Sequence, residues 1–417
     1  MPELLSPAGN FEKLRAAILY GADAVYLAGN CFGMRSAADN FTDDELFAAS
    51  DYVHQRNKKL YLTVNTMPHG HEYPMLRSYL KKISSAGIDA FIVADLGVMA
   101  ELKDIIPDAE IHISTQASIV SPAAAKAYAA LGAKRLVLAR ELDLAEIKAI
   151  RDALPGDVEL EAFVHGSMCV SYSGRCLLSN SLTGRDANRG ACTQPCRWNY
   201  KIVEEKRLEE PYPIEENALG TFIMSSKDMC TVQIIPELIA AGIDSFKIEG
   251  RMKSAYYTAV VTNAYRMALD AYLHDPEGYV FDERLITELE SVSHREYATG
   301  YYLDKPIENA QTAQNTGYIR EKAYFATAVE YNSEELPAGL VYENDGGRLY
   351  KFIQRNKVSI GDSAEVISPG RIGLPFCVSE LYDEKGAEIA SAPHPAMHFY
   401  VRVPFEVKVG DIMRSGK

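Results

Sequence analysis

Four of the seven cysteines in this chain lie within one stretch, EAFVHGSMCVSYSGRCLLSNSLTGRDANRGACTQPC, which covers residues 161–196. Their spacing is Cys169-x6-Cys176-x15-Cys192-x3-Cys196. Four thiolates so close in sequence can complete a tetrahedral zinc site or hold an iron–sulfur cluster. Zinc usually binds cysteine pairs about two to four residues apart, whereas a cluster tolerates irregular gaps because each thiolate bonds a different iron. The spacing therefore favours a cluster and leaves zinc open.

A repeated pattern in the sequence indicates the scaffold that positions these thiols. The phrases YGADAVYLA, AGIDAFIVA, LGAKRLVLA and AGIDSFKIE each place a glycine between a helical pattern and a buried strand. They alternate with strands expected in ELLSPAG, KLYLTVNT, EIHISTQA and ELEAFVHG. Eight strands separated by helices predict a (β/α)8 TIM-like barrel over residues 1–305. An open doubly wound sheet is the alternative, and it is disfavoured because no G-x-G-x-x-G follows the first strand.

In such a barrel, polar residues at the carboxyl ends of the strands face the active site. The pattern places a dense polar set there, although strand ends also meet solvent and are often polar for that reason alone. The set is Ser6, Asn65, Asp95, Ser114, Thr115, Gln116, Arg140, Glu141, His165, Lys247, Glu249 and Arg251.

Two segments depart from the barrel repeat. An insertion at about 166–228, before the last strand, holds the cysteines and then a β-hairpin expected in WNYKIVEEKRL and GTFIMSSKDM. After the linker IENAQTAQNTG, short β-rich runs alternate with turn signals over residues 318–417. They predict a small antiparallel β-barrel domain that could bind RNA.

Composition narrows the class of protein. The chain has 417 residues, of which 47% are hydrophobic and 24% charged, and its formal net charge is −14. It shows no membrane span and no signal peptide, so we expect a cytoplasmic protein in which clustered thiols serve metal binding or catalysis. The excess of acidic residues argues against a protein that binds nucleic acid over its whole surface. It permits a local basic patch.

The sequence around Cys169, the first of the four clustered cysteines, resembles the signature of a known family. The run E-x-F-x-H-G-S-M-C from Glu161 to Cys169, with Gly174, Cys176 and Ser179 downstream, resembles the signature of the collagenase-like peptidase family, unassigned peptidase family 32. The likeness extends from LLSPAG through DAVYLA, STQAS and KIEGR to the small C-terminal barrel. It covers nearly the whole chain.

The resemblance implies a cofactor and a reaction. The branch of the family to which the chain is most similar hydroxylates a tRNA wobble uridine to 5-hydroxyuridine without oxygen, depends on prephenate and carries a [4Fe–4S] cluster. It implies Cys169, Cys176, Cys192 and Cys196 as cluster ligands. Because some relatives use a later cysteine, Cys230 is an alternative fourth ligand.

Three groups of candidate site residues follow from these expectations. Prephenate is a dicarboxylate with a ketone, so its pocket needs cations and neutral donors. The catalytic candidates are His165, Lys247 and Glu249; the substrate-binding candidates are Asn65, Gln116, Arg140 and Arg251; the RNA-binding candidates are Arg185, Arg189, Arg197 and Lys253. The arginines could instead screen the negative charge of a cluster.

Three further functions stay open. A peptidase would need a set of catalytic residues, yet neither the zinc-binding motif H-E-x-x-H nor the serine motif G-x-S-x-G occurs. A cysteine peptidase would need a thiol beside a histidine, and a pairing of Cys169 with His165 is conceivable. The chain could also hydroxylate ribosomal RNA, as some members of the family do, or bind RNA without catalysis through a fold that a structural cluster supports. The expected partners are tRNA and prephenate, with no membrane, and the sequence leaves open a partner protein or a homo-oligomer.

Overall fold

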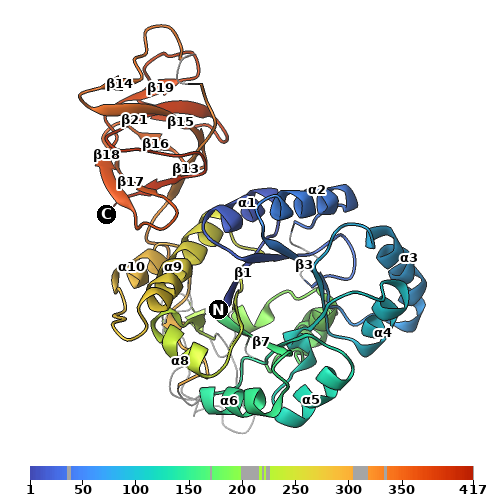
Figure 1. Cartoon of the computed structure of the whole chain (residues 1–417). Coiled ribbons are helices and arrows are strands. Elements are labelled where there is room, and N and C mark those ends of the chain that lie inside the picture. Colours follow the sequence, from blue (N-terminus) through green and yellow to red (C-terminus); the bar gives the residue numbers. More distant parts are fainter. Residues whose placement is uncertain are drawn as a thin grey trace.

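The chain forms a closed parallel barrel followed by a second, antiparallel domain (Figure 1). The computed structural model describes residues 1–34, 39–169, 171–198, 216–217, 220–221, 226–303, 318–332 and 336–416. The barrel strands are β1 (Glu3–Pro7), β2 (Ala24–Leu27), β3 (Lys59–Val64), β4 (Ala90–Val93), β5 (Ile111–Ile113), β6 (Arg135–Val137), β7 (Glu159–Ser167) and β11 (Ser245–Ile248). Strand β11 pairs in parallel with both β1 and β7, which closes the ring. The predicted (β/α)8 barrel is confirmed.

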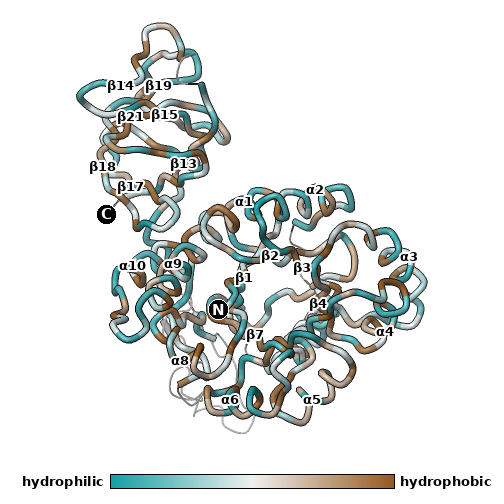
Figure 2. The backbone as a smooth tube through the Cα atoms, in the orientation of Figure 1, coloured by the Kyte–Doolittle hydropathy of each residue, from teal (hydrophilic) through white to brown (hydrophobic). Residues whose placement is uncertain are grey.

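A ring of helices covers the outside of the barrel. They are α1 (Phe11–Leu19), α2 (Asp43–His54), α3 (Tyr73–Ile83), α4 (Leu96–Ile105), α5 (Pro122–Ala130), α6 (Leu144–Ala153), α8 (Ile235–Ala240) and α9 (Ala255–His274), with α10 (Arg284–Glu290) packed on α9. Polar side chains at Asn10, Thr42, Asp95 and Asp143 accept hydrogen bonds from the first turns of their helices. Hydrophilic residues recur along these helices (Figure 2), because each turns one apolar face inward.

The barrel has an apolar layer on each side of its strands. Between strands and helices lies the large core, which includes Leu62, Val93 and Phe246. Inside the ring, a smaller apolar cluster contains Tyr26 and Tyr61. Side chains therefore fill this layer of the interior, and the candidate site lies at the carboxyl ends of the strands.

The insertion folds against the carboxyl-end face of the barrel. It contains α7 (Leu178–Thr183) and the short 3-10 turns η3 (Ala187–Arg189) and η4 (Pro195–Arg197). The predicted hairpin is described only as β8 (Glu216–Asn217) paired with β9 (Gly220–Thr221), and most of its residues lie outside the described ranges. Its last residues instead form β10 (Asp228–Cys230), which pairs antiparallel with the end of β7 and parallel with β12 (Tyr297–Ala298).

The C-terminal domain is an antiparallel sheet curved into a half-barrel. Its order is β18 (Leu374–Cys377), β17 (Ser363–Ile367), β22 (Ile412–Ser415), β13 (Tyr324–Ala328), β15 (Gly347–Gln354), β21 (His398–Val403), β19 (Leu381–Asp383), with β14 (Glu343–Asn344) on β15 and a separate pair of β16 (Val358–Ser359) with β20 (Ser391–Ala392). The sequence predicts a small antiparallel β-barrel here, and the structure has an antiparallel sheet that forms a half-barrel. The predicted linker lies outside the described residues.

One buried arginine joins the two domains. Arg414 in β22 is 1% exposed, and its Nη2 lies 2.7 Å from Glu288 of α10 and 2.7 Å from Glu365 of β17. Its Nη1 donates to the hydroxyl of Ser291 at 2.8 Å. Nearby, Tyr20 donates from its hydroxyl to the carbonyl of Ile367 at 2.9 Å. These contacts fix the half-barrel against α10 and the end of α1.

We expect Arg414→Met to lower the free energy of unfolding by about 3–5 kcal/mol, because it leaves two mostly buried carboxylates without their shared cation. Arg348→Met is the matched control: Arg348 is 43% exposed and pairs with an exposed Glu343, so its loss should change the free energy of unfolding far less. Urea denaturation of both variants measures the difference. Equal effects would show that the domain junction contributes nothing.

Candidate functional site

A pocket opens at the carboxyl ends of the barrel strands. The residues that line it come from seven strands and the segments that follow them, and they include Cys169 and six other predicted site residues. The residues that line it are Tyr26, Met34, Thr63, Asn65, Ile92, Ser114, Thr115, Gln116, Val137, Arg140, Glu141, Phe163, Met168, Cys169, Ser173, Gly174, Lys247, Glu249 and Arg251. The structure therefore brings Asn65, Gln116, Arg140, Lys247, Glu249 and Arg251 together.

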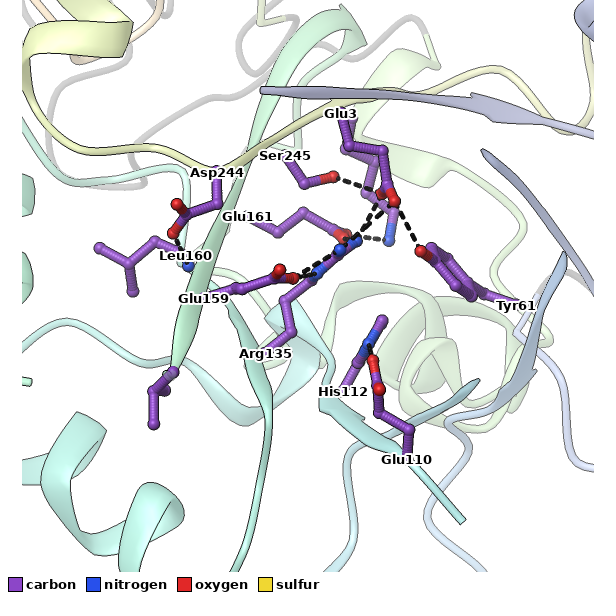
Figure 3. A network of polar contacts seen from close by, with 12 residues as sticks. Glu3, Tyr61, Glu110, His112, Arg135, Glu159, Leu160, Glu161, Asp244 and Ser245 are labelled. Atoms are coloured by element: carbon purple, nitrogen blue, oxygen red, sulfur yellow. Dashed lines mark hydrogen bonds and ion pairs between the residues drawn. The ribbon is translucent and has the colours of Figure 1, made fainter. Parts of the chain in front are cut away.

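Beneath the pocket, a buried ion network fills the other end of the barrel. The guanidinium of Arg135, on β6, lies between the carboxylates of Glu3, Glu159 and Glu161 (Figure 3), with Nη1 at 2.5 Å from Glu3 and 3.2 Å from Glu161. The hydroxyl of Tyr61 donates to Glu3 at 2.6 Å. We call Glu3, Tyr61, Arg135 and Glu161 the floor network.

Lys247 connects the floor network to the pocket. Its Nζ lies 2.5 Å from Glu161 Oε1, and the two side chains are 5% and 0% exposed. The same Nζ lies 4.5 Å from the ring centre of Tyr26 and 5.5 Å from that of Phe163. A charged ammonium is therefore held at the base of the pocket by a carboxylate below and two aromatic faces beside it.

The charge on Glu161 is set by these neighbours. Burial raises the pKa of its carboxyl, but Lys247 and Arg135 outweigh burial and bring the pKa below its ordinary value. Glu161 is therefore ionised, and it compensates both cations. Removing its charge would leave the ammonium of Lys247 buried without the carboxylate that it contacts in the described structure.

Arg140 forms part of the pocket wall. Its Nη1 donates to the carbonyl of Ser167 at 2.6 Å, and its guanidinium carbon lies 3.8 Å from the ring centre of Phe163. Glu249 Oε2 lies 4.0 Å from Arg140 Nη2 and 3.5 Å from the hydroxyl of Tyr26. The stacked, hydrogen-bonded guanidinium is held in one orientation, which suits recognition of a planar carboxylate.

On the opposite side, polar groups are held in place by one another. Arg251 Nη1 donates to the hydroxyl of Thr63 at 3.3 Å. The amide of Asn65 accepts from the backbone N–H of Met34 at 3.1 Å and donates to the hydroxyl of Ser114 at 3.3 Å. This side combines a cation with neutral hydrogen-bonding groups, as the sequence predicts.

The beginning of the insertion closes the pocket laterally. Gly174 adopts φ of +74°, and a Cβ there would lie 2.1 Å from the carbonyl oxygen of Gln116, so only glycine permits this approach. The backbone N–H of Ser173 donates to Glu141 at 2.8 Å. Cys169 lines the pocket from the same segment. The cysteine-bearing insertion is therefore one wall of the site.

The predicted position of His165 in the pocket is wrong. The pairing of β7 with β11 skips Val164, so that Lys247 opposes Phe163 while Ile248 opposes His165. This bulge turns the imidazole outward, where it lies among Tyr257, Tyr265 and Tyr297.

The environment of His165 keeps the ring neutral. It is 1% exposed, and burial lowers its pKa to about 3. The hydroxyl of Tyr265 lies 3.4 Å from Nδ1 and that of Tyr297 3.5 Å from Nε2. His165 therefore packs in the core behind the pocket, away from the reacting groups.

The four clustered thiols are brought together in space. Burial raises the pKa of Cys196, Arg197 opposes the rise, and the nearby thiols of Cys169, Cys192 and Cys176 add to it. The backbone N–H of Gln194 donates to the Cys192 sulfur at 3.3 Å, a contact that stabilises a thiolate.

Four thiols are a donor set that either an iron–sulfur cluster or a single zinc ion can use. Within the described ranges, no three His, Cys, Asp or Glu side chains are arranged to hold one metal ion. One zinc ion would draw four sulfurs to about 2.3 Å from a common centre, whereas a cluster bonds each sulfur to a separate iron and keeps the sulfurs further apart.

Cys230, the alternative ligand, lies elsewhere. It pairs with His165 in the ladder between β10 and β7 and is buried. Burial raises its pKa to about 12, and the side chains that influence it are Tyr265 and Glu290 rather than another thiol. Among the described thiols, Cys196 is the one grouped with Cys169, Cys176 and Cys192.

The predicted RNA-binding residues occupy different settings. Arg185 is exposed. Arg189 forms a two-pronged ion pair with Glu72, at 2.8 Å for each N–O contact, which attaches the insertion to the turn η1 (Gly70–Glu72). Arg197 and Lys253 lie together in a groove beside the pocket. Arg189 is therefore engaged within the protein.

Sequence reasoning missed several pocket residues. Tyr26, Thr63 and Phe163 lie inside strands rather than at their ends. Strand alternation provides the missing signal, because counting back by two from Asn65 gives Thr63 and then Tyr61, both of which point inward. Ser173 and Gly174 could not be found this way, since they reach the pocket only through the docking of the insertion.

Comparison with known proteins gives consistent matches. The model for Peptidase family U32 matches residues 9–312, and that for the Peptidase family U32 C-terminal domain matches residues 337–414. The chain is 36% identical over 417 residues to "tRNA hydroxylation protein P1" of Bacillus subtilis, covering 100% of this chain and 95% of that protein. It is 33% identical over 447 residues to "tRNA hydroxylation protein P" of Escherichia coli, covering 98% and 95%. It is also 32% identical over 381 residues to "Collagenase" of Porphyromonas gingivalis, covering 88% and 86%.

None of the helices in the described ranges is both long and apolar enough to span a membrane.

We expect Glu161→Gln to reduce the free energy of unfolding at neutral pH by about 3 kcal/mol, because it leaves the buried ammonium of Lys247 without the carboxylate that it contacts. The folded-state pKa of Glu161 lies below its ordinary value of 4.5. The contribution of Glu161 to stability is therefore complete above pH 4.5 and is lost as the pH falls through the folded-state pKa. The difference between wild type and variant should therefore shrink below about pH 4.5.

Glu159→Gln is the control on the same strand. It also pairs with Arg135, at 2.6 Å, but is 47% exposed, so its loss should cost less than about 1 kcal/mol. Urea denaturation across the pH range measures both. A Glu161→Gln penalty that does not depend on pH would contradict this charge compensation.

Proposed function

Since the chain belongs to Peptidase family U32, we propose that it is an RNA-modifying member of that family that hydroxylates tRNA. The proposed reaction converts the wobble uridine to 5-hydroxyuridine without oxygen and depends on prephenate. The observation that carries the proposal is the pocket itself: its polar lining combines cations with neutral donors, and its wall includes the first of four clustered cysteines.

The relatives support tRNA as the substrate. The two proteins named for tRNA hydroxylation match this chain over nearly the whole length of both partners. A nucleobase reaches a pocket of this kind only after leaving its stack, and an anticodon loop offers unpaired bases at small energetic cost. The open end of the barrel gives such a base direct access.

The geometry weighs against a cysteine peptidase. That reaction needs a thiol beside an imidazole that accepts its proton. The nearest histidine in sequence to Cys169 is His165, and its ring faces the core behind the pocket with a pKa of about 3. The described pocket lining holds no histidine. The Collagenase relative nevertheless makes proteolysis the second function to test.

Within the pocket, each predicted residue has a role in the proposed reaction. Arg140 and Arg251 bind the two carboxylates of prephenate, while Asn65 and Gln116 hydrogen-bond its neutral oxygens. The ammonium of Lys247 stabilises negative charge that develops at the base of the pocket, and Glu249 exchanges protons at its rim.

The cysteines provide the proposed cofactor site. Cys169, Cys176, Cys192 and Cys196 would hold a [4Fe–4S] cluster, which supplies electron transfer when bound. Because Cys169 also lines the pocket, the proposed cofactor and the substrate share one wall.

Expression in a host lacking tRNA wobble hydroxylation tests the function. Mass spectrometry of tRNA nucleosides should show 5-hydroxyuridine or its derivatives restored by the wild-type chain. In a host that lacks the ribosomal RNA modification as well, hydroxycytidine that appears in ribosomal RNA instead would identify ribosomal RNA as the substrate. Cleavage of gelatin by the purified protein, with no change in either RNA, would refute the proposal in favour of proteolysis.

Iron analysis tests the cofactor separately. Anaerobically purified protein should contain about four irons and absorb broadly near about 400 nm. Cys196→Ser should remove most of the iron, and Cys230→Ser is the matched control that should keep it. Stoichiometric zinc without sulfide would reject the cluster, and iron loss in Cys230→Ser alone would exchange the assignment of the fourth ligand.

A further inference from the structure

A second groove adjoins the candidate site. It is lined by Ser167, Gln194, Arg197, Glu249, Gly250, Met252, Lys253, Ser293, Tyr318 and Arg320. Glu249 belongs to the lining of both the groove and the pocket. The groove therefore starts at the rim of the pocket and leads toward the segment that enters the C-terminal domain.

A single β-bridge shapes one side of this groove. Ile319 and His294 exchange two backbone hydrogen bonds, at 2.8 and 3.2 Å. Residues on either side of a bridged residue point to the same face of an extended chain, so Tyr318 and Arg320 project together. Both line the groove, and Tyr318 is 47% exposed.

The groove combines an aromatic ring with several cations. Lys253 Nζ lies 4.5 Å from the ring centre of Tyr318 and donates to the carbonyl of Ser293 at 2.9 Å. Arg197 Nη1 donates to the hydroxyl of Tyr318 at 2.7 Å and to the side chain of Gln194 at 3.1 Å. Arg320 is exposed and forms no ion pair within the part of the chain that the structure describes.

Cations outnumber carboxylates in the described lining of the groove, where Glu249 faces Arg197, Lys253 and Arg320. Asp228 is engaged by Arg295, with N–O distances of 2.7 and 3.0 Å. Burial lowers the pKa of Lys253 to about 8; Asp228 opposes the shift, whereas Arg197, Arg295 and Arg320 add to it. Positive charge is thus concentrated at this place in a chain whose net charge is −14.

We infer that this groove, formed by Arg197, Lys253, Tyr318 and Arg320, is a subsite for the single-stranded RNA that flanks the reacting base. The cations contact backbone phosphates, and a neighbouring base stacks on the ring of Tyr318. The inference rests on the proposed function and extends it, because it assigns recognition of the adjoining nucleotides to residues outside the pocket.

Binding of a fluorescent anticodon stem–loop with uridine at the wobble position tests the subsite. Arg320→Gln should weaken binding several-fold at low salt and reduce the slope of log Kd against log salt by about one. Tyr318→Ala should weaken binding about tenfold with little change in that slope, because stacking releases no counterions. Tyr318→Phe keeps the ring and should bind like wild type.

Arg77→Gln is the control for charge. Arg77 is 42% exposed and pairs with Glu101 and Asp104 on the outer helices. The Arg77→Gln substitution therefore removes one positive charge far from the groove. If Arg320→Gln and Tyr318→Ala both bind and hydroxylate RNA like wild type, the subsite is refuted while the proposed function stands. If wild-type protein neither binds the stem–loop nor hydroxylates tRNA, the proposed function itself fails.

Discussion

The carboxylate of Glu161 is the constraint on which the barrel and its pocket both depend. It is fully buried, and a buried charge is tolerated only when it is paired and hydrogen-bonded. Arg135 on one side and Lys247 on the other satisfy it. Because these three residues belong to β6, β7 and β11, the same ion pairs join the strands where the ring closes and hold an ammonium at the base of the pocket. The side chain of Glu161 therefore serves both the closure of the barrel and the placement of a charged group in the pocket.

The bulge at Val164 explains both a success and a failure of sequence reasoning. Strand repeats and their glycines predict all eight barrel strands, and strand ends then predict Asn65, Arg140 and Lys247 in the pocket. This reasoning assumes strict alternation along each strand. In β7 the register shifts by one residue, so His165 turns to the outer core. Nothing in the local sequence reveals the shift, which arises from pairing with β10 and β11.

Other features depend on contacts between segments far apart in the chain. The engagement of Arg189 by Glu72 spans 117 residues, and no local pattern marks either partner. Likewise, the approach of Gly174 to the carbonyl of Gln116 exists only because the insertion docks on the barrel. The sequence predicts that this insertion carries the thiols, and the fold adds that it also forms a wall of the pocket. Residue types were therefore easier to predict than their partners.

The floor network has a kinetic consequence. Glu3, Tyr61, Arg135 and Glu161 fill the end of the barrel opposite the pocket, so in the described structure the pocket has its opening on one face. A reaction that consumes a small molecule and a nucleotide must admit both through that opening. The molecule that sits deeper has to arrive first, and its product has to wait until the nucleotide departs. For any such two-substrate reaction, this geometry favours ordered binding, in which the deeper molecule enters before the one nearer the opening.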